Sequence, residues 1–207
     1  NFCAALGESD FTIKTKLQRG GKYTQHWSLE LTQDDMIKAT ATIVCAVRNE
    51  TFSHQPSAMP DVKDPSEYPP LPAKNFSNWI SCYDFRFANG GLEISKPNAD
   101  LKSARTMAWV RDEPPRPLDH LSLAALSDSF FLRLLHVRGT MEPMGTVSIT
   151  THIFATPEEL AAQGTGHILA VADANRFHHN FHDQHMQLYG TDGTILATGT
   201  QIVWFRQ

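Results

Sequence analysis

The fold is decided by one stretch of sequence, DHLSLAALSDSFFLRLL at residues 119–135. It begins just after prolines at 114, 115 and 117, with Asp119 in the position of an N-cap, and Gly139 follows as a stop signal. Leucine, alanine and phenylalanine occupy nearly every side of the expected helix, a composition typical of a buried helix rather than a surface one. We therefore predict one continuous, buried helix from Asp119 to Leu135.

Strand patterns lie on both sides of this helix. Runs of β-branched and aromatic residues predict strands at 79–87 and 103–110 before it, and at 146–154, 167–176, 185–189 and 195–205 after it. The expected order is two strands, one helix and a long meander. This order predicts an α+β unit in which an antiparallel sheet wraps around a central helix.

A second set of strands precedes this unit. Residues 11–47 alternate in three runs separated by RGGK at 19–22 and QDD at 33–35, which predicts an antiparallel meander. Prolines then recur at 56, 60, 65, 69, 70 and 72, as in an extended linker. We expect a partial first unit at 1–50, a linker at 51–74 and a complete second unit at 75–207.

The two units look like an internal duplication whose first copy lacks its helix. Position 1 is Asn rather than Met, and the residues after it already read like a strand. A first meander without a helix would leave a large apolar face uncovered. We therefore expect the natural gene product to carry a further amino-terminal portion, about one strand and one helix.

Composition excludes several classes of protein. The formal net charge of -4 and the pI near 6.2 give no basic surplus of the kind that marks nucleic-acid binders, so small molecules or other protein chains are the expected partners. Cys3, Cys45 and Cys82 suit neither a disulfide framework nor a zinc site, which favours the cytoplasm. No apolar run approaches the roughly 18 to 20 residues that span a bilayer, and no signal pattern is present, so membrane insertion is not expected.

Asp128 is the most informative polar residue. Helical spacing places it on a face with apolar neighbours, and burying an unpaired carboxylate costs several kcal/mol. Such a group either serves a functional site or acts as a structural carboxylate that caps a neighbouring strand or loop. Thr146 and Gln201 are polar residues in predicted strands. Each taken alone is more often a solvent-facing strand residue than a catalyst.

Three motifs together resemble the thioesterase II branch of the hotdog superfamily. LSDSFF at 126–131 is similar to the central-helix motif of that family, and TVSIT at 146–150 to the strand with its catalytic threonine. DGTILATGTQ at 192–201 is similar to the closing hairpin that carries a glutamine. The resemblance covers the second unit, and residues 12–47 look like the latter half of a first hotdog.

The resemblance implies a double hotdog whose first hotdog is incomplete at its N-terminus. It further implies an acyl-CoA thioesterase in which Asp128, Thr146 and Gln201 position a water beside the thioester carbonyl. Asp128 would accept the proton of this water, and the other two would orient it. No cofactor and no covalent intermediate are implied, acyl-CoA is the substrate, and a homo-oligomer is expected.

One stretch departs from that family, RFHHNFHDQH at 176–185, which holds four of the ten histidines. A metal site formed by His178, His182 and Asp183 is one reading, but the histidines share neither one strand face nor a recognised ligand spacing. Structural or pocket-lining roles are favoured, and no metal is expected. Arg176 and His178 are candidates for contacts with the phosphates of coenzyme A.

Two other functions compete with hydrolysis, because a fold does not fix a reaction. A hydratase of the same fold would carry an Asp and a His separated by Asn-Pro at the lead-in to the helix, and residues 117–128 lack that pattern. The stronger alternative is a non-catalytic acyl-CoA-binding protein. An incomplete first hotdog favours this alternative, because the acyl pocket of such folds lies between two hotdogs.

Overall fold

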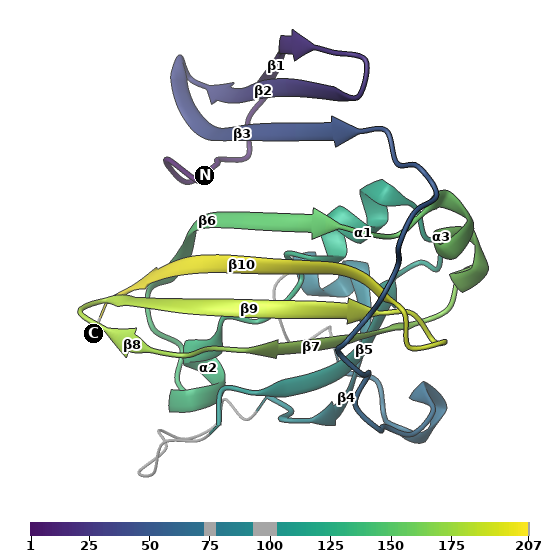
Figure 1. Cartoon of the computed structure of the whole chain (residues 1–207). Helices are drawn as coiled ribbons and strands as arrows, with labels where there is room; N and C mark the ends of the chain where they lie inside the picture. The colour runs from purple at the N-terminus through teal and green to yellow at the C-terminus, as the bar shows by residue number, and fades with distance from the viewer. Residues whose placement is uncertain (73–77, 93–102, 207) are drawn as a thin grey trace. The chain divides into compact units, whose positions relative to one another are not determined.

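The computed structural model describes residues 1–72, 78–92 and 103–206, which form two compact units (Figure 1). The first unit comprises residues 1–54 with 146–148, and the second comprises residues 55–145 with 149–207. Among the described residues, no helix has the length and apolar character needed to cross a membrane.

The first unit contains the predicted three-stranded meander. Its strands are β1 (Thr12–Gly20), β2 (Thr24–Gln33) and β3 (Met36–Ala46), paired antiparallel in the order β1-β2-β3. Asp34 and Asp35 both have positive φ, at 52° and 58°, as a two-residue hairpin turn of the primed type requires. The sequence prediction of strands and turns is confirmed here.

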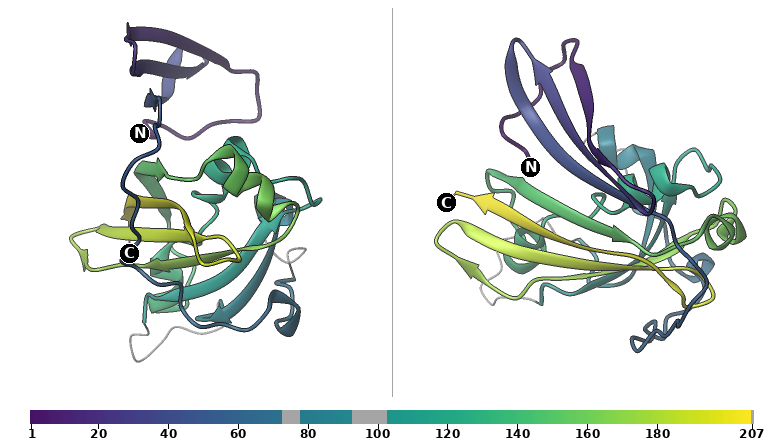
Figure 2. Two further views of the ribbon diagram at one scale, coloured as in Figure 1. Left: turned by 45° about the vertical axis from the view of Figure 1, so that its right-hand side comes forward. Right: turned by 45° about the horizontal axis from the view of Figure 1, so that its top comes forward.

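The second unit is built on a seven-stranded sheet in the order β4-β5-β7-β9-β10-β6, with β8 paired to β9 beside that path. Figure 2 shows this sheet from two further sides, with its strands twisted relative to one another. The strands are β4 (Tyr83–Asn89), β5 (Thr106–Asp112), β6 (Met144–Ile153), β7 (Ile168–Asp173), β8 (Phe177–His178), β9 (Phe181–Tyr189) and β10 (Ile195–Phe205). All predicted strands of this unit are present, although β9 begins four residues earlier than expected and β4 four residues later, because Asn78–Cys82 form a short 3-10 helix.

The prediction of one continuous central helix is wrong. The chain forms α1 (His120–Leu126) and α2 (Arg133–Arg138), separated by residues 127–132. The break has a local cause, because the Ser127 hydroxyl donates to the Ala124 carbonyl at 2.7 Å and the Ser129 hydroxyl to the Leu126 carbonyl at 2.8 Å. Serine hydroxyls that bond the last carbonyls of a helix satisfy groups that a further turn would otherwise use.

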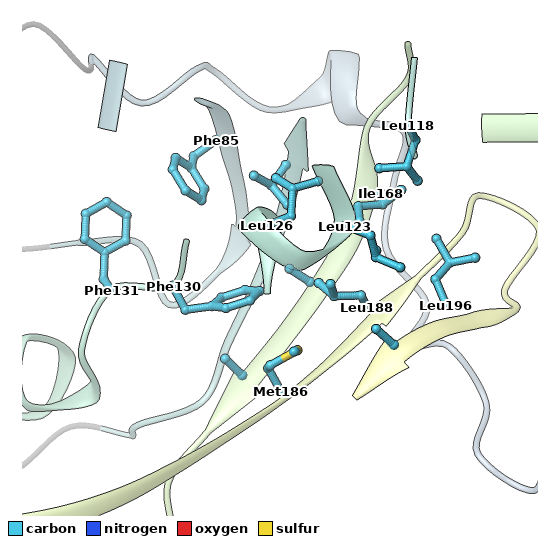
Figure 3. Packing of buried hydrophobic residues seen from close by; sticks show 14 of the residues in the cluster. Phe85, Leu118, Leu123, Leu126, Phe130, Phe131, Ile168, Met186, Leu188 and Leu196 are labelled. Carbon is cyan, nitrogen blue, oxygen red and sulfur yellow. The ribbon is translucent and has the colours of Figure 1, made fainter. Parts of the chain in front are cut away.

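Helix α1 is also buried on one side only. Leu123 and Leu126 lie in the main apolar cluster at 0% and 1% exposure, whereas Leu121 is 77% exposed. Figure 3 shows Leu123 and Leu126 in this cluster with Ile168 of β7 and Leu188 of β9. The helix therefore packs on the sheet with one stripe, and the prediction that it is buried on every side is corrected.

The proline-rich segment packs against the opposite face of the sheet. Met59, Val62 and Tyr68 contact a second cluster formed by Trp109, Leu169, Val171 and Tyr189. The indole Nε1 of Trp109 donates to the Lys63 carbonyl at 3.0 Å. Strand β7 is consequently buried on both faces, as its all-apolar sequence ILAVA requires. This segment belongs to the second unit from Gln55 onward, while the domain limits inferred from sequence remain predictions.

One helix was missed from the sequence, α3 (Pro157–Gln163). Thr156 caps it, with the Thr156 Oγ1 accepting from the Glu159 N–H at 3.2 Å and the Glu159 carboxylate accepting from the Thr156 N–H at 2.8 Å. This is a capping box with proline at the first helical position, and its signal was present in the sequence TPEE at 156–159.

The one-sided packing of α1 can be tested with two leucines of the same helix. Leu123→Ala should lower the free energy of unfolding by about 3 kcal/mol, because it opens a cavity in a well-packed cluster. Leu121→Ala should change it by less than about 0.5 kcal/mol, because that side chain is largely in solvent. Urea denaturation of both variants measures the difference, and equal losses would contradict the described orientation of α1.

Candidate active site

Asp128 lies in the break that follows α1. Its backbone N–H donates to the Ala125 carbonyl at 3.1 Å, which continues the helix by one irregular turn. Asp128 itself, Leu121, Ala124 and Ala125 are exposed, whereas Phe131 and Leu135 are buried. The apolar enclosure predicted for this carboxylate is therefore only half present, because the helix ends before it and the preceding turn faces away from the sheet.

The Asp128 carboxylate is held by Gln201. The Nε2 of Gln201, a residue of β10 that is only 5% exposed, donates to Asp128 Oδ1 at 2.8 Å. The protein packed around the carboxylate strips part of its hydration and raises the pKa of Asp128 above its ordinary value, while the hydrogen bond from Gln201 opposes this rise. The structure thus brings two of the three predicted catalytic residues into direct contact.

Gln184 is a neighbour that the sequence analysis missed. It lies on β9 directly opposite Gln201 in the antiparallel register, and its Nε2 donates to Gln201 Oε1 at 2.7 Å. Both amides are buried. The signal was available, because counting back through the hairpin at Asp192-Gly193 pairs the two glutamines, but the predicted strand began at residue 185 and excluded position 184.

A hydroxyl pair lies next to Asp128 in the chain. The Oγ of Ser127 and the Oγ1 of Thr151 on β6 are 2.9 Å apart and share a hydrogen bond. Thr146, the threonine predicted from sequence, is half-buried on the same strand, five residues earlier. Its catalytic role stays a prediction, and Thr151 is a second threonine that sequence reasoning did not single out from the TVSITT run.

A small cavity of about 10 Å³ adjoins this network. Ser127, Gln184 and Gln201 contribute to its lining together with Thr200. The volume is close to the space of one water molecule, but the exposed surface of the cavity is mostly apolar and comes from residues such as Phe130, Ile149 and Met186. The cavity is therefore a small, mainly apolar void behind Gln201.

The histidine-rich stretch forms the β8–β9 hairpin. His179 and Asn180 occupy its two turn positions, with φ of 46° and 66°. Asp183 accepts hydrogen bonds from the N–H groups of Asn175 and Arg176 at 3.0 and 2.9 Å, and these bonds hold its pKa below the usual value even though burial opposes them. His182 is 2% exposed, and its ring lies 4.7 Å from that of Phe177. Ring packing and hydrogen bonds thus hold His182 and Asp183 within the hairpin, and in the described parts of the chain no three His, Cys, Asp or Glu side chains gather at one place.

A larger cavity of about 450 Å³ opens beside this hairpin. Its lining comprises Leu134, Val137, Arg138, Phe177, His178, His179, Asn180 and Phe205. His178 is thus placed in a concave, partly basic site, while the backbone of the exposed Arg176 is tied to Asp183. Contact of either residue with substrate remains a prediction.

The chain was compared with known proteins. Residues 56–205 match the model of the acyl-CoA thioesterase C-terminal domain. A crystal structure of a conserved protein of unknown function with a hot dog fold, from Alicyclobacillus acidocaldarius, is 38% identical over 100% of this chain and 76% of its own, with a TM-score of 0.92. No match was found among curated proteins.

Two more distant structures share the fold. The acyl-CoA thioesterase II of Mycobacterium marinum is 14% identical, covers 99% of this chain and 78% of its own, and has a TM-score of 0.73. The tesB protein of Mycobacterium avium subspecies paratuberculosis is 16% identical, covers 100% of this chain and 76% of its own, and also has a TM-score of 0.73. The predicted hotdog fold is confirmed by these similarities.

The raised pKa of Asp128 predicts that Asp128→Asn stabilises the folded protein. An acid whose pKa is higher in the folded than in the unfolded state destabilises the fold once it ionises, so the penalty is absent below the ordinary value of 3.8 and complete above the raised pKa. At pH 7 the melting temperature of Asp128→Asn should rise by about 1–2 °C, a small gain because the carboxylate keeps contact with solvent.

A matched control has the opposite sign. The pKa of Asp183 is lowered by its hydrogen bonds, so its ionised form stabilises the fold above the unfolded pKa, and Asp183→Asn should lower the melting temperature at pH 7. A melting temperature for Asp128→Asn below that of the parent would show that Asp128 is a stabilising structural carboxylate.

Proposed function

Because this chain belongs to the acyl-CoA thioesterase family, we propose that it hydrolyses the thioester bond of fatty acyl-CoA, using water activated by Asp128, Thr146 and Gln201. The observation that carries this proposal is the hydrogen bond of 2.8 Å from Gln201 to Asp128. The bond joins the Asp128 carboxylate, which follows the end of α1 and has a raised pKa, to the buried amide of Gln201. The two residues were predicted from two different sequence motifs.

The roles follow from the donor and acceptor capacity of each group. Gln201 donates to Asp128 Oδ1, so Oδ2 is the oxygen that accepts a proton from water. The water oxygen attacks the thioester carbonyl, the proton passes to Asp128, and the tetrahedral intermediate expels the coenzyme A thiolate, which takes that proton. A carboxylate whose pKa lies above the ordinary value is a stronger base at neutral pH and suits this step.

The threonine has a positioning role in this proposal. Thr146 supplies a hydroxyl that orients the water, as the resemblance of TVSIT to the family strand implies. Thr151 is a second hydroxyl of the same strand and is tied to Ser127, the residue before the proposed base. Replacing the two threonines separately distinguishes a hydroxyl that holds water from one that holds the loop.

Substrate contacts are proposed at the β8–β9 hairpin. His178 and Arg176 would meet the phosphates of coenzyme A, and His178 lines the cavity of about 450 Å³ that also contains Arg138. Phe205 of β10 lines that cavity, and it follows Gln201 by four residues, which is ~13 Å along the strand. This is the separation between the proposed site of hydrolysis and the proposed phosphate site. The pantetheine arm has about a dozen bonds between sulfur and phosphate, a similar extended length of ~14 Å.

We further propose that the protein works in fatty acyl metabolism of the cytoplasm as a homo-oligomer. Cys3, Cys45 and Cys82 are all free and exposed, which suits a reducing compartment. Phe181 and Trp204 face each other across β9 and β10 and are 46% and 37% exposed, an apolar pair of the kind that subunit contacts cover.

Incubation with acyl-CoAs of graded chain length, with free thiol monitored, tests the activity directly. Release of thiol that depends on enzyme concentration supports the proposal. Tight binding of acyl-CoA by calorimetry without release of thiol would instead identify a non-catalytic acyl-CoA-binding protein.

Replacement of the three proposed residues should affect turnover unequally. Asp128→Asn should lower kcat by ~10²–10⁴-fold, because it removes the proton acceptor, whereas Gln201→Ala and Thr146→Ala should each cause a smaller loss. KM should change little, because apolar contacts hold the acyl chain. Steady-state kinetics with Thr151→Ala as the matched comparison checks the assignment. Parental turnover in a folded Asp128→Asn variant would exclude Asp128 as the base.

A further inference from the structure

We propose that Gln184 is a positioning residue that fixes which end of the Gln201 side-chain amide faces Asp128. This inference rests on the proposed function and extends it to a residue that does not touch the substrate. Gln184 is 4% exposed and is joined to Asp128 through Gln201, so its proposed effect on the reaction passes through Gln201.

The orientation of both amides is set by a backbone group that can only donate a hydrogen bond. The backbone N–H of Arg133, the first residue of α2, donates to Gln184 Oε1 at 3.2 Å. A backbone N–H cannot accept a hydrogen bond, so the oxygen of the Gln184 amide must face it. The nitrogen of the same amide then points to the other side, where it donates to Gln201 Oε1 at 2.7 Å.

The same constraint passes to the second amide. Because Gln201 Oε1 accepts from Gln184, its Nε2 must face Asp128, where it donates at 2.8 Å. A glutamine amide has two nearly isosteric orientations, and its neighbours alone determine which one is adopted. Here the choice is determined from both ends, since Arg133 N–H can only donate and an ionised carboxylate can only accept.

The opposite orientation is strongly disfavoured inside this network. Turning Gln201 alone would set its Oε1 against the Asp128 carboxylate and its Nε2 against the Nε2 of Gln184. The two hydrogen bonds of Gln201 in this network would then be replaced by contacts between like groups, which is costly inside the core. The donor is therefore presented to Asp128 before any substrate arrives.

The anchor of this relay is itself fixed to the sheet. The Arg133 side chain is 1% exposed, and its guanidinium donates to the Phe131 carbonyl, to the Ala104 carbonyl at 3.3 Å and to Thr106 Oγ1 at 2.6 Å. These bonds tie the start of α2 to the beginning of β5. The N–H that determines the direction of the amide relay thus belongs to a rigid part of the core.

Asp128 is the group that reports on the relay. The hydrogen bond from Gln201 lowers the pKa of Asp128 against the rise caused by burial, so loosening Gln201 should raise this pKa further. Tyr83 on β4 feels the charge of Asp128, and His185 on β9 lines the small cavity beside Gln201. Both of these titratable residues stay unchanged in the variants that test the relay.

The test compares Gln184→Met, Gln201→Met and the double variant, with Gln187→Met as a control on the same strand. Gln184→Met should lower kcat about tenfold with KM unchanged, and shift the acid limb of the kcat profile to higher pH, by less than Gln201→Met does. In the Gln201→Met background, Gln184→Met should have little further effect on kcat, because the hydrogen bond through which Gln184 orients Gln201 is already gone. Gln187→Met should behave like the parent.

An activity-independent measurement separates this inference from the proposed function. The carboxyl ¹³C titration of Asp128, followed by NMR, should show a higher pKa in Gln184→Met than in the parent even if the parent hydrolyses no acyl-CoA. An unchanged Asp128 titration in a folded Gln184→Met variant, or fully additive effects of the two replacements on kcat, would overturn the inference. If Gln184→Met does not fold, Gln184→Asn takes its place, since it keeps a buried amide that is one methylene too short to bridge Arg133 and Gln201.

Discussion

The second unit depends on how one carboxylate is accommodated where a helix ends. The hydroxyls of Ser127 and Ser129 bond carbonyls of the last turn of α1, and the chain restarts as α2 only at Arg133. A continuous helix would carry Asp128 along a regular face. The break instead leaves the carboxylate within 2.8 Å of Gln201 on β10 while keeping it open to solvent. The role proposed for Asp128 requires a carboxylate that is both held and accessible, and the broken helix meets both conditions.

That arrangement requires a rigid sheet behind it. Strands β9 and β10, which carry Gln184 and Gln201, follow β7, and β7 is buried on both faces, by α1 on one side and by the proline-rich segment on the other. Gly199 adds a local constraint, because a Cβ there would lie 3.1 Å from the Thr150 carbonyl and 2.5 Å from the Met186 methyl. A side chain at position 199 would therefore displace the Met186 methyl and crowd the Thr150 carbonyl of β6.

The succession of strands along the chain could be predicted because alternation and the DG hairpin are local signals, whereas Asp128 and Gln201 were proposed as site residues through the resemblance of their motifs to a known family. The break in the helix could not, since the apolar pattern of LSLAALSDSFFLRLL is continuous and the competing serine hydrogen bonds carry no periodicity. The packing of Met59 and Val62 was also unreadable, because proline spacing indicates extension and says nothing about which face a segment covers. The pairing of Gln184 with Gln201 can be predicted only if the strand includes residue 184. The predicted strand began at residue 185, whereas β9 begins at residue 181.

Several polar residues of the core form one connected system that ends at Asp128. Thr106 and Arg133 join β5 to α2, Gln184 and Gln201 continue from α2 across β9 and β10, and Asp128 ends the series at the surface. Polar groups buried in a low-dielectric interior are costly unless every partner is present, so such a system has few alternative arrangements and specifies its geometry sharply. Polar side chains thus take the place of some apolar packing in the core, and the hydrogen bonds among them have a fixed direction toward Asp128. Among the described residues, this hydrogen-bonded series reaches solvent at Asp128. A bound molecule would therefore meet the series at Asp128.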